Sequence, residues 1–161
     1  MKNQSDRPVD WVVEVIKRQE NKLYRTALVI MKNKSDAEDI LQEVFIKLVE
    51  KSPQFESPEH ETAWLMRVAI NLCKSRLRFR LRRTTTPLLD TYPAHDEEQQ
   101  DITETVLSLP ANYRIVINLF YYHGYATKEI AEIIQRKEST VRKDLTRARR
   151  LLKHFLEGEE E

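Results

Sequence analysis

The sequence predicts an all-α protein of two small helical domains joined by a flexible acidic linker. Its 161 residues suffice for one domain or for two small ones. Only two glycines occur, and all six prolines fall between stretches whose apolar residues recur at helical spacing. These observations favour long helices with short connections over a sheet-rich fold.

Three helices are expected in a first domain over residues 9–83. The first spans residues 9–32, as one helix or two that abut, and its apolar side is formed by Val12, Ile16, Leu23, Ala27 and Ile30. Ser35 and Glu38 form a capping-box pattern, so a second helix is expected to begin there. Its apolar positions lie within about 140° of arc. They are Ile40, Leu41, Val44, Phe45 and Leu48.

A third helix is expected from about Glu59 to the low eighties, after a loop bounded by Pro53 and Pro58. Trp64 lies at the edge of its inner face and is interpreted as a core residue rather than a platform for base stacking. The residues predicted to pack inward are Leu65, Val68, Leu72 and Phe79.

Residues 84–101 combine threonines, two prolines and an acidic run with little periodicity, so they are predicted to be a flexible linker. A second domain over residues 102–157 is expected to follow. Its four short helices are predicted at about residues 102–108, 112–123, 127–135 and 138–156. The apolar stripe of the last helix is formed by Val141, Leu145, Ala148, Leu152 and Phe155.

The charges are segregated along the chain, although the net charge is only +1. Residues 64–83 hold seven Lys or Arg and no Asp or Glu. Residues 84–109 hold six acids and no Lys or Arg, and residues 128–153 hold nine bases against four acids. Two basic blocks separated by an acidic connection favour nucleic-acid binding.

Each basic block forms one face of a predicted helix. The face of the third helix suits a nucleic-acid backbone and one base, and it holds Arg67, Asn71, Lys74 and Arg78. The last helix follows an apolar helix and a tight turn, as in a helix-turn-helix. Its basic face holds Arg142, Lys143, Thr146, Arg147, Arg149, Arg150 and Lys153. By itself, either pattern also fits the solvated face of a structural helix, and the second fits a membrane surface or a calmodulin-like partner.

The outward arc of the second helix carries Asp39, Gln42, Glu43 and Glu50 around an apolar Ile46. A single exposed isoleucine usually has no role. At the centre of an acidic patch, however, it fits a docking site for a basic protein partner.

No catalytic residue, cofactor site or metal site is predicted, so an enzyme is not expected. The sequence has no P-loop and no glycine-rich turn, and its four histidines are scattered singly. Cys73 is the single cysteine, which excludes an internal disulfide and fits a reducing cytoplasm. No apolar run approaches about 18 residues, so no membrane insertion is expected. The first ten residues also lack the apolar stretch of a signal peptide.

From about Leu23 to Leu156 the chain resembles the extracytoplasmic-function sigma factors, group 4 of the sigma-70 family. The run DAEDILQEVFIKLVEK (residues 36–51) is similar to the family's core-binding helix. The run TAWLMRVAINLCKSRLRFRLRR (residues 62–83) is similar to its −10 recognition and melting helix. Residues 107–152 resemble its −35-binding domain. Two different matches in the right order make the resemblance specific.

The resemblance implies a sigma region 2-like domain over residues 9–83 and a region 4-like helix-turn-helix domain over residues 102–157. The residues implied to contact core RNA polymerase, with the apolar centre of their patch, are Asp39, Gln42, Glu43 and Ile46. Those implied to lie at the −10 element are Arg67, Asn71, Lys74, Arg76 and Arg78, with Asn71 taking part in base reading. Bases of the −35 element would face Arg142, Lys143 and Thr146, and its backbone would face Arg147, Arg149 and Arg150. The implied partners are core RNA polymerase, promoter DNA and an anti-sigma factor that could hold this cytoplasmic protein at a membrane.

The chain departs from the family pattern next to its predicted recognition helix. Gln135 and Arg136 replace the usual glycine and apolar residue of the turn. Ala126 replaces the usual capping serine, so Thr127 is expected to cap one residue later. Two other functions stay open: a helix-turn-helix regulator that does not bind core polymerase, and a helical adaptor that binds only proteins. The acidic face of the second helix argues against a dimerising regulator, and the two basic blocks argue against the adaptor.

Overall fold

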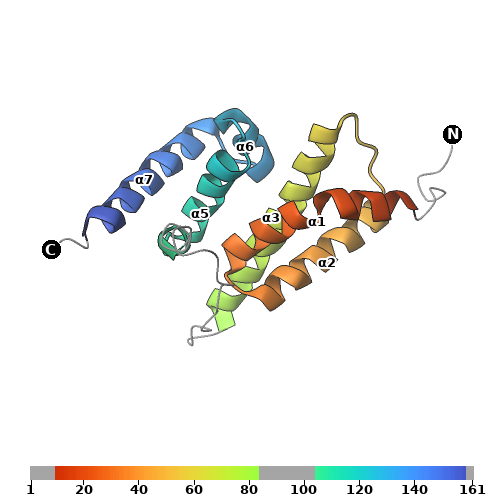
Figure 1. Cartoon of the computed structure of the whole chain (residues 1–161), viewed down its shortest axis with the longest axis horizontal. Helices are drawn as coiled ribbons and strands as arrows, with labels where there is room; N and C mark the ends of the chain where they lie inside the picture. The colour runs from red at the N-terminus through yellow and green to blue at the C-terminus, as the bar shows by residue number, and fades with distance from the viewer. Residues whose placement is uncertain (1–9, 84–103, 159–161) are drawn as a thin grey trace. The chain divides into compact units, whose positions relative to one another are not determined.

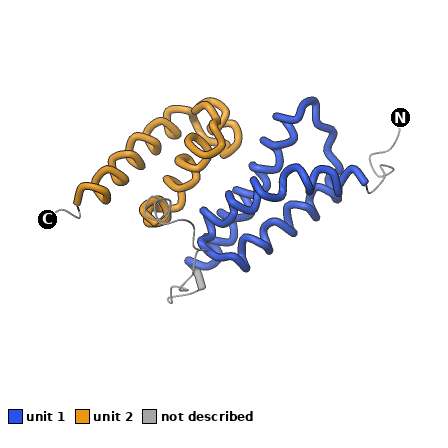
Figure 2. Tube along the Cα trace, in the orientation of Figure 1, with its two compact units in different colours: residues 1–90 blue, residues 91–161 orange. Residues whose placement is uncertain are grey.

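The computed structural model describes residues 10–83 and 104–158, and helices make up most of both ranges (Figure 1). No strand occurs in these ranges, which confirms the predicted all-α class. The chain divides into two compact units, residues 1–90 (unit 1) and residues 91–161 (unit 2) (Figure 2). The predicted linker at residues 84–101 lies outside the described residues.

Unit 1 is a bundle of three helices, α1 (Asp10–Met31), α2 (Lys34–Lys51) and α3 (Pro58–Arg83). Each helix contacts the other two. The largest fully buried side chains of the bundle are Leu23, Ile30, Ile40, Leu48, Leu65, Met66 and Ile70. Burying an apolar side chain of this size stabilises a fold by about 1.5–3 kcal/mol. This packing therefore decides which faces of α2 and α3 point outward.

The start of α2 differs from the prediction in its capping residue. Asn33, and not Ser35, caps the helix, because its side-chain oxygen accepts the N–H of Asp36 at 3.0 Å. Lys32 precedes it with a φ of 59°, the left-handed conformation that commonly ends a helix. The sequence pattern placed the helix start within two residues, since asparagine caps a helix as well as serine does.

Most of the predicted inner positions are buried or half-buried, with one clear error in α3. Phe79 is 55% exposed, so the prediction that it packs inward is wrong. Arg80 already pairs with Asp36 in the first turn of α2, so Phe79 lies near the end of the bundle. The buried face of α3 is instead formed by Leu65, Met66, Ala69, Ile70 and Cys73.

Unit 2 contains a helical turn at residues 104–107, followed by α5 (Ala111–Ile117), the π-helix η2 (Asn118–Tyr122), α6 (Thr127–Ile134) and α7 (Glu138–Glu157). The single helix expected at residues 112–123 runs through α5 and η2, and its second half is a π-helix. There the N–H of His123 donates to the carbonyl of Asn118 at 3.1 Å, five residues back. The core of unit 2 is formed by Leu109, Ile115, Leu119, Ile130 and Leu145.

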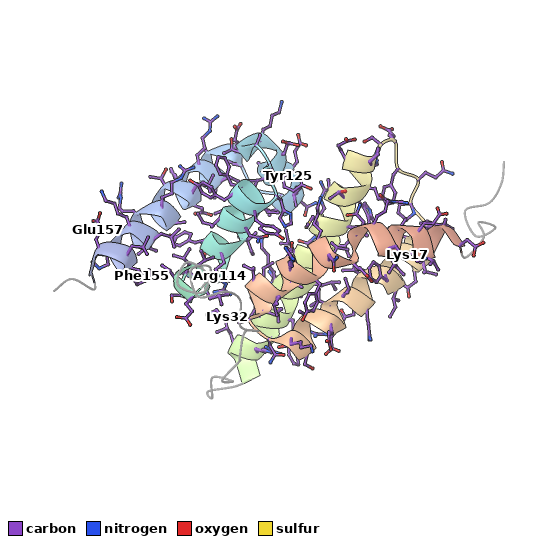
Figure 3. The ribbon with its side chains drawn as sticks, viewed as in Figure 1. Lys17, Lys32, Arg114, Tyr125, Phe155 and Glu157 are labelled. Carbon is purple, nitrogen blue, oxygen red and sulfur yellow. The ribbon has the colours of Figure 1, made fainter. Side chains whose placement is uncertain are left out.

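Arg114 is buried in α5 and ties this helix to the turn before it (Figure 3). Its Nη1 donates to the carbonyl of Leu109 at 2.5 Å. Burial lowers the pKa of Arg114 to about 10, so the guanidinium remains charged at neutral pH. Arg114 therefore serves the fold of unit 2 and is closed off from solvent.

Candidate functional site

The last helix, α7, separates a buried apolar stripe from an exposed basic face. Val141, Leu145 and Ala148 are buried, Leu152 is half-buried, and Phe155 is 39% exposed. Figure 3 shows Phe155 near the end of the helix. The stripe is therefore covered only over its first part. Every residue of the predicted basic face is exposed: Arg142, Lys143, Thr146, Arg147, Arg149, Arg150 and Lys153.

The turn before α7 keeps a left-handed residue although it lacks a glycine. Gln135 has φ 56° and ψ 49°, and its N–H donates to the carbonyl of Ala131 at the end of α6. The N–H of Arg136 reaches the same carbonyl at 3.0 Å. This is the hydrogen-bond pattern of a helix C-cap in which glycine is usual. Helix α6, a turn at residues 135–137 and α7 thus form a helix-turn-helix, with Ile130, Ile133 and Ile134 buried beneath it.

One carboxylate links the beginnings of α6 and α7. Glu138 Oε1 accepts a hydrogen bond from Thr127 Oγ1 at 2.9 Å and another from Arg142 Nη2 at 2.8 Å. The prediction that Thr127 caps α6 is wrong, because Ala126 occupies the cap position and Glu129 Oε1 accepts its N–H at 3.0 Å. The Arg142 side chain remains 68% exposed. Sequence reasoning missed Glu138, although its spacing of four residues from Arg142 indicates an ion pair.

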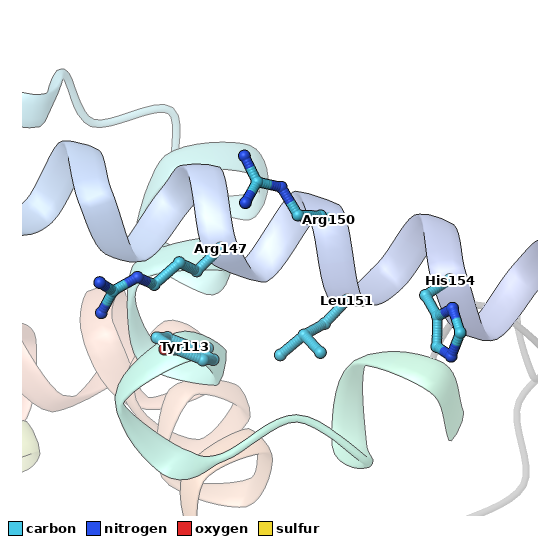
Figure 4. A pocket seen from close by; sticks show the side chains of 5 residues that line it. All are labelled: Tyr113, Arg147, Arg150, Leu151 and His154. Atoms are coloured by element: carbon cyan, nitrogen blue, oxygen red, sulfur yellow. The ribbon is translucent and has the colours of Figure 1, made fainter.

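The arginines in the second half of α7 have different surroundings. Arg147, Arg150 and Tyr113 line a hollow of about 420 Å³ together with Leu151 and His154. Figure 4 shows Arg147 extending over Tyr113, while Arg150 projects away from it.

Arg149 lies against η2 instead. Its Nε donates to the hydroxyl of Tyr121 at 2.6 Å, and its guanidinium lies over that ring at 5.5 Å. No sequence pattern pointed to Tyr121, because this contact depends on how η2 packs beside α7.

The stripe predicted on α3 is only partly exposed. Asn71 and Arg78 are exposed, whereas Arg67 and Lys74 are half-buried. The four residues are spaced over three helical turns, so they share one face of α3. Asn71 therefore offers an accessible amide on this face, with the Arg78 guanidinium beyond it.

Arg76 lies apart from this stripe, in a cluster of ion pairs between α2 and α3. Its Nη2 lies 2.6 Å from Glu43 Oε1, and its Nη1 lies 3.5 Å from Asp39 Oδ2 and 3.9 Å from Asp36 Oδ1. Arg80 pairs with the other oxygen of Asp36, which is buried. Arg76, which was expected at the −10 element, is thus paired with Asp39 and Glu43, which were expected to contact the polymerase.

The outward face of α2 also has an apolar part. Ile46 is 55% exposed and Val49 is 54% exposed, one helical turn apart. Gln42, one turn before Ile46, is exposed as well. Val49 was missed in the sequence, although its spacing of three residues from Ile46 is the signal that could have identified it.

Trp64 packs with the loop between α2 and α3. Its ring lies 5.8 Å from that of Phe55, and Phe55 also makes an edge contact with His60 at 5.5 Å. The N–H of Glu56 donates to His60 Nδ1 at 3.2 Å. These contacts hold the loop against the first turns of α3, and Trp64 is half-buried among them.

Within the described residues, no group of three or more His, Cys, Asp or Glu side chains could hold a metal ion. Burial raises the pKa of the Cys73 thiol to about 12, so the thiol stays protonated at neutral pH. None of the described helices is long and apolar enough to cross a membrane.

Two family models match the chain. Residues 15–83 match sigma-70 region 2, and residues 99–152 match sigma-70 region 4. The chain is 30% identical to the RNA polymerase sigma factor SigV of Bacillus subtilis, over 85% of this chain and 86% of that protein. It is 27% identical to the ECF RNA polymerase sigma factor SigM of Mycobacterium tuberculosis, over 89% of this chain and 76% of that protein.

A solved structure has the same fold. The sigma factor RpoE of Bartonella quintana, in complex with the anti-sigma factor NepR, superposes with a TM-score of 0.76. The match covers 92% of this chain and 98% of that chain, at 23% sequence identity.

Proposed function

The chain belongs to the extracytoplasmic-function RNA polymerase sigma factors, and we propose that it binds core RNA polymerase and directs it to promoters with particular −35 and −10 elements. The observation that carries this proposal is the helix-turn-helix of unit 2. It presents an exposed basic face on α7 while Val141, Leu145 and Ala148 anchor the opposite face. A second helix of this kind fits the major groove of DNA.

Promoter contacts at the −35 element are assigned along α7. Residues near the start of a recognition helix reach base edges, so Arg142, Lys143 and Thr146 are proposed to face bases. Arg147 and Arg150 are proposed to contact the DNA backbone. Arg149 is assigned to the backbone as well, through the N–H groups that it does not use on Tyr121.

Contacts at the −10 element are assigned to the outward stripe of α3. The exposed Asn71 and Arg78 are the best placed; Lys74 lies between them on the same face, and Arg67 lies one turn before Asn71. Unpaired bases of a melted strand are trapped in pockets of the bound protein rather than opened by side-chain chemistry. Arg76 is the weakest member of the set, because three carboxylates of α2 already surround its guanidinium.

Core polymerase is proposed to dock on the outward face of α2. The exposed side chains of Gln42, Ile46 and Val49 give an apolar centre with a polar neighbour, and Asp39 and Glu43 add negative charge beside it. An apolar centre with a charged rim is the usual anatomy of a protein interface.

The protein is proposed to act by binding rather than as an enzyme, and to work in the cytoplasm of a bacterium. An anti-sigma factor that holds it at a membrane remains a prediction.

Run-off transcription with purified core polymerase and a promoter library tests the proposal. We expect transcripts from a subset of promoters that share −35 and −10 sequences, and only when the chain is added. Sequence-specific DNA binding without any transcript would instead identify a helix-turn-helix regulator that does not bind core polymerase.

A further inference from the structure

We propose that Glu138 is a positioning residue for −35 recognition, which fixes the Arg142 guanidinium so that it reads one base. This inference rests on the proposed function of α7. It starts from one carboxylate oxygen, Glu138 Oε1, which accepts hydrogen bonds from Thr127 at 2.9 Å and from Arg142 at 2.8 Å. Glu138 is thereby hydrogen-bonded both to α6, through Thr127, and to Arg142, the side chain proposed to contact DNA.

The contact with Thr127 distinguishes this arrangement from an ordinary surface ion pair. A glutamate and an arginine four residues apart on an exposed helix hold each other only weakly, because both side chains rotate freely. Here the carboxylate is also held from α6, and its side chain is 37% exposed against 68% for Arg142. The more buried partner is therefore fixed, and the more exposed one is oriented by it.

The hydroxyl of Thr127 makes this bond because Thr127 does not occupy the cap position of α6, where Ala126 lies. Glu129 Oε1 accepts the N–H of Ala126 at 3.0 Å, at the cap position that carries no hydroxyl. A serine or threonine at residue 126 would have used its own oxygen on the helix amides. Thr127, one residue later, instead points its oxygen at Glu138.

The geometry leaves Arg142 able to recognise a base. A guanidinium carries five N–H donors, and the hydrogen bond to Glu138 uses one of the two on Nη2. The remaining donors can meet the two acceptors of guanine in the major groove, the commonest specific contact of arginine. Holding the side chain beforehand lowers the entropy lost on binding, which corresponds to about 3- to 10-fold in affinity for the correct base.

The charge of Glu138 predicts an effect of opposite sign on unspecific binding. A carboxylate at the start of a recognition helix repels DNA phosphates, so its removal should strengthen binding to DNA of any sequence. Glu138→Ala should therefore lower discrimination between bases while total affinity for non-promoter DNA stays equal or rises. A residue that only stabilised α7 would weaken both together.

The test uses the full chain bound to core polymerase and a set of promoters that differ at single −35 positions. Arg142→Ala identifies the position that this arginine reads. We expect Glu138→Ala to lose about 3- to 10-fold of the discrimination at that position and at no other. Thr127→Val should lose less at the same position, because it removes only the hydroxyl that fixes the carboxylate. The double variant of Glu138 and Arg142 should match Arg142→Ala alone.

Glu157→Ala is the matched control, since it removes the same charge from the other end of α7. It should leave discrimination at every −35 position unchanged. The inference is overturned if Glu138→Ala retains full discrimination at the position read by Arg142, or if the two substitutions act additively. If Arg142→Ala changes preference at no position in the otherwise native chain, the proposed base contact of Arg142 fails, which is a separate result.

Discussion

Replacing Arg76 with alanine should destabilise unit 1 more than it weakens DNA binding. The guanidinium lies 2.6 Å from the Glu43 carboxylate and 3.5 Å from that of Asp39. Its side chain is only 25% exposed, so it lies between α2 and α3 rather than extending into solvent. The family resemblance implies a phosphate contact for Arg76, whereas these ion pairs indicate that it joins the two helices.

The size of the effect follows from the type of bond and its exposure. A hydrogen bond to a charged group contributes about 1.5–3 kcal/mol when it is shielded from water, and an exposed ion pair about 0.2–1 kcal/mol. The Glu43 side chain is 43% exposed, so an intermediate contribution applies. We expect Arg76→Ala to lower the free energy of unfolding by about 1–2 kcal/mol. In a domain of this size each kcal/mol lowers Tm by about 4–8 °C.

Urea unfolding of the full chain, followed by tryptophan fluorescence, measures this loss. Both tryptophans, Trp11 and Trp64, lie in unit 1 and therefore report on its unfolding. A double-mutant cycle with Glu43→Gln isolates the Arg76–Glu43 pair from other effects. Arg78→Ala is the matched control, because it removes an exposed arginine two residues further along α3. It should change the free energy of unfolding by less than about 0.5 kcal/mol.

The variant with the larger effect should be the other one when promoter binding by the sigma–polymerase complex is measured. Arg78→Ala should weaken this binding more than Arg76→Ala, since Arg78 is exposed on the stripe with Asn71. The reasoning is refuted if Arg76→Ala leaves the free energy of unfolding unchanged and weakens promoter binding as much as Arg78→Ala does. Arg76 would then contact phosphate.

Three further predictions concern the other surfaces. Joint replacement of Gln42 and Ile46 by alanine should weaken core-polymerase binding at least about tenfold, without touching the Arg76 ion pairs; unchanged binding in a titration would remove this face of α2 as the docking site. Arg142→Ala should relax preference at one or two −35 positions, whereas Arg150→Ala should weaken all sequences alike and lower the salt slope by about 1; equal losses at every sequence would mean that Arg142 contacts phosphate. Because burial raises the pKa of Cys73 from 9.0 to about 12, a maleimide at pH 8 should label the folded chain far more slowly than the urea-unfolded chain. The stability of unit 1 should also fall as the pH rises above 9.0, since the thiol then ionises only in the unfolded chain.

The sequence predicts the helices well, because their signals are local. Apolar spacing and prolines place the helices of unit 1, and an isoleucine-rich segment followed by a basic amphipathic one predicts the helix-turn-helix. The errors occur where the outcome depends on distant residues. Phe79 has the helical spacing of the core residues but lies near the end of the bundle. In the π-helix η2 a helical turn holds an extra residue, and the composition of this segment does not signal it.

The candidate site divides in the same way. Exposure of the α7 cations follows from periodicity, since a buried Val141–Leu145–Ala148 stripe leaves the other positions outside. The partners of individual side chains do not follow from it. Glu43 and Arg76 are 33 residues apart, and Arg149 and Tyr121 are 28 apart, so only the packed structure brings them together. For the same reason the sequence predicts two separate surfaces on α2 and α3, although Asp39, Glu43 and Arg76 share one cluster of charges.

That cluster also distinguishes the two acids proposed to contact polymerase. Asp36, Asp39 and Glu43 supply three carboxylates for the guanidinium groups of Arg76 and Arg80, so one negative charge is left over. Asp36 is buried, and Glu43 makes the shortest contact with Arg76. Asp39 is 56% exposed and lies 3.5 Å from Arg76. It therefore loses less interaction with Arg76 than Glu43 would when a cation of a partner protein approaches. Under the proposed function, Asp39 is therefore the acid that offers charge to polymerase, and Glu43 mainly holds α3 against α2.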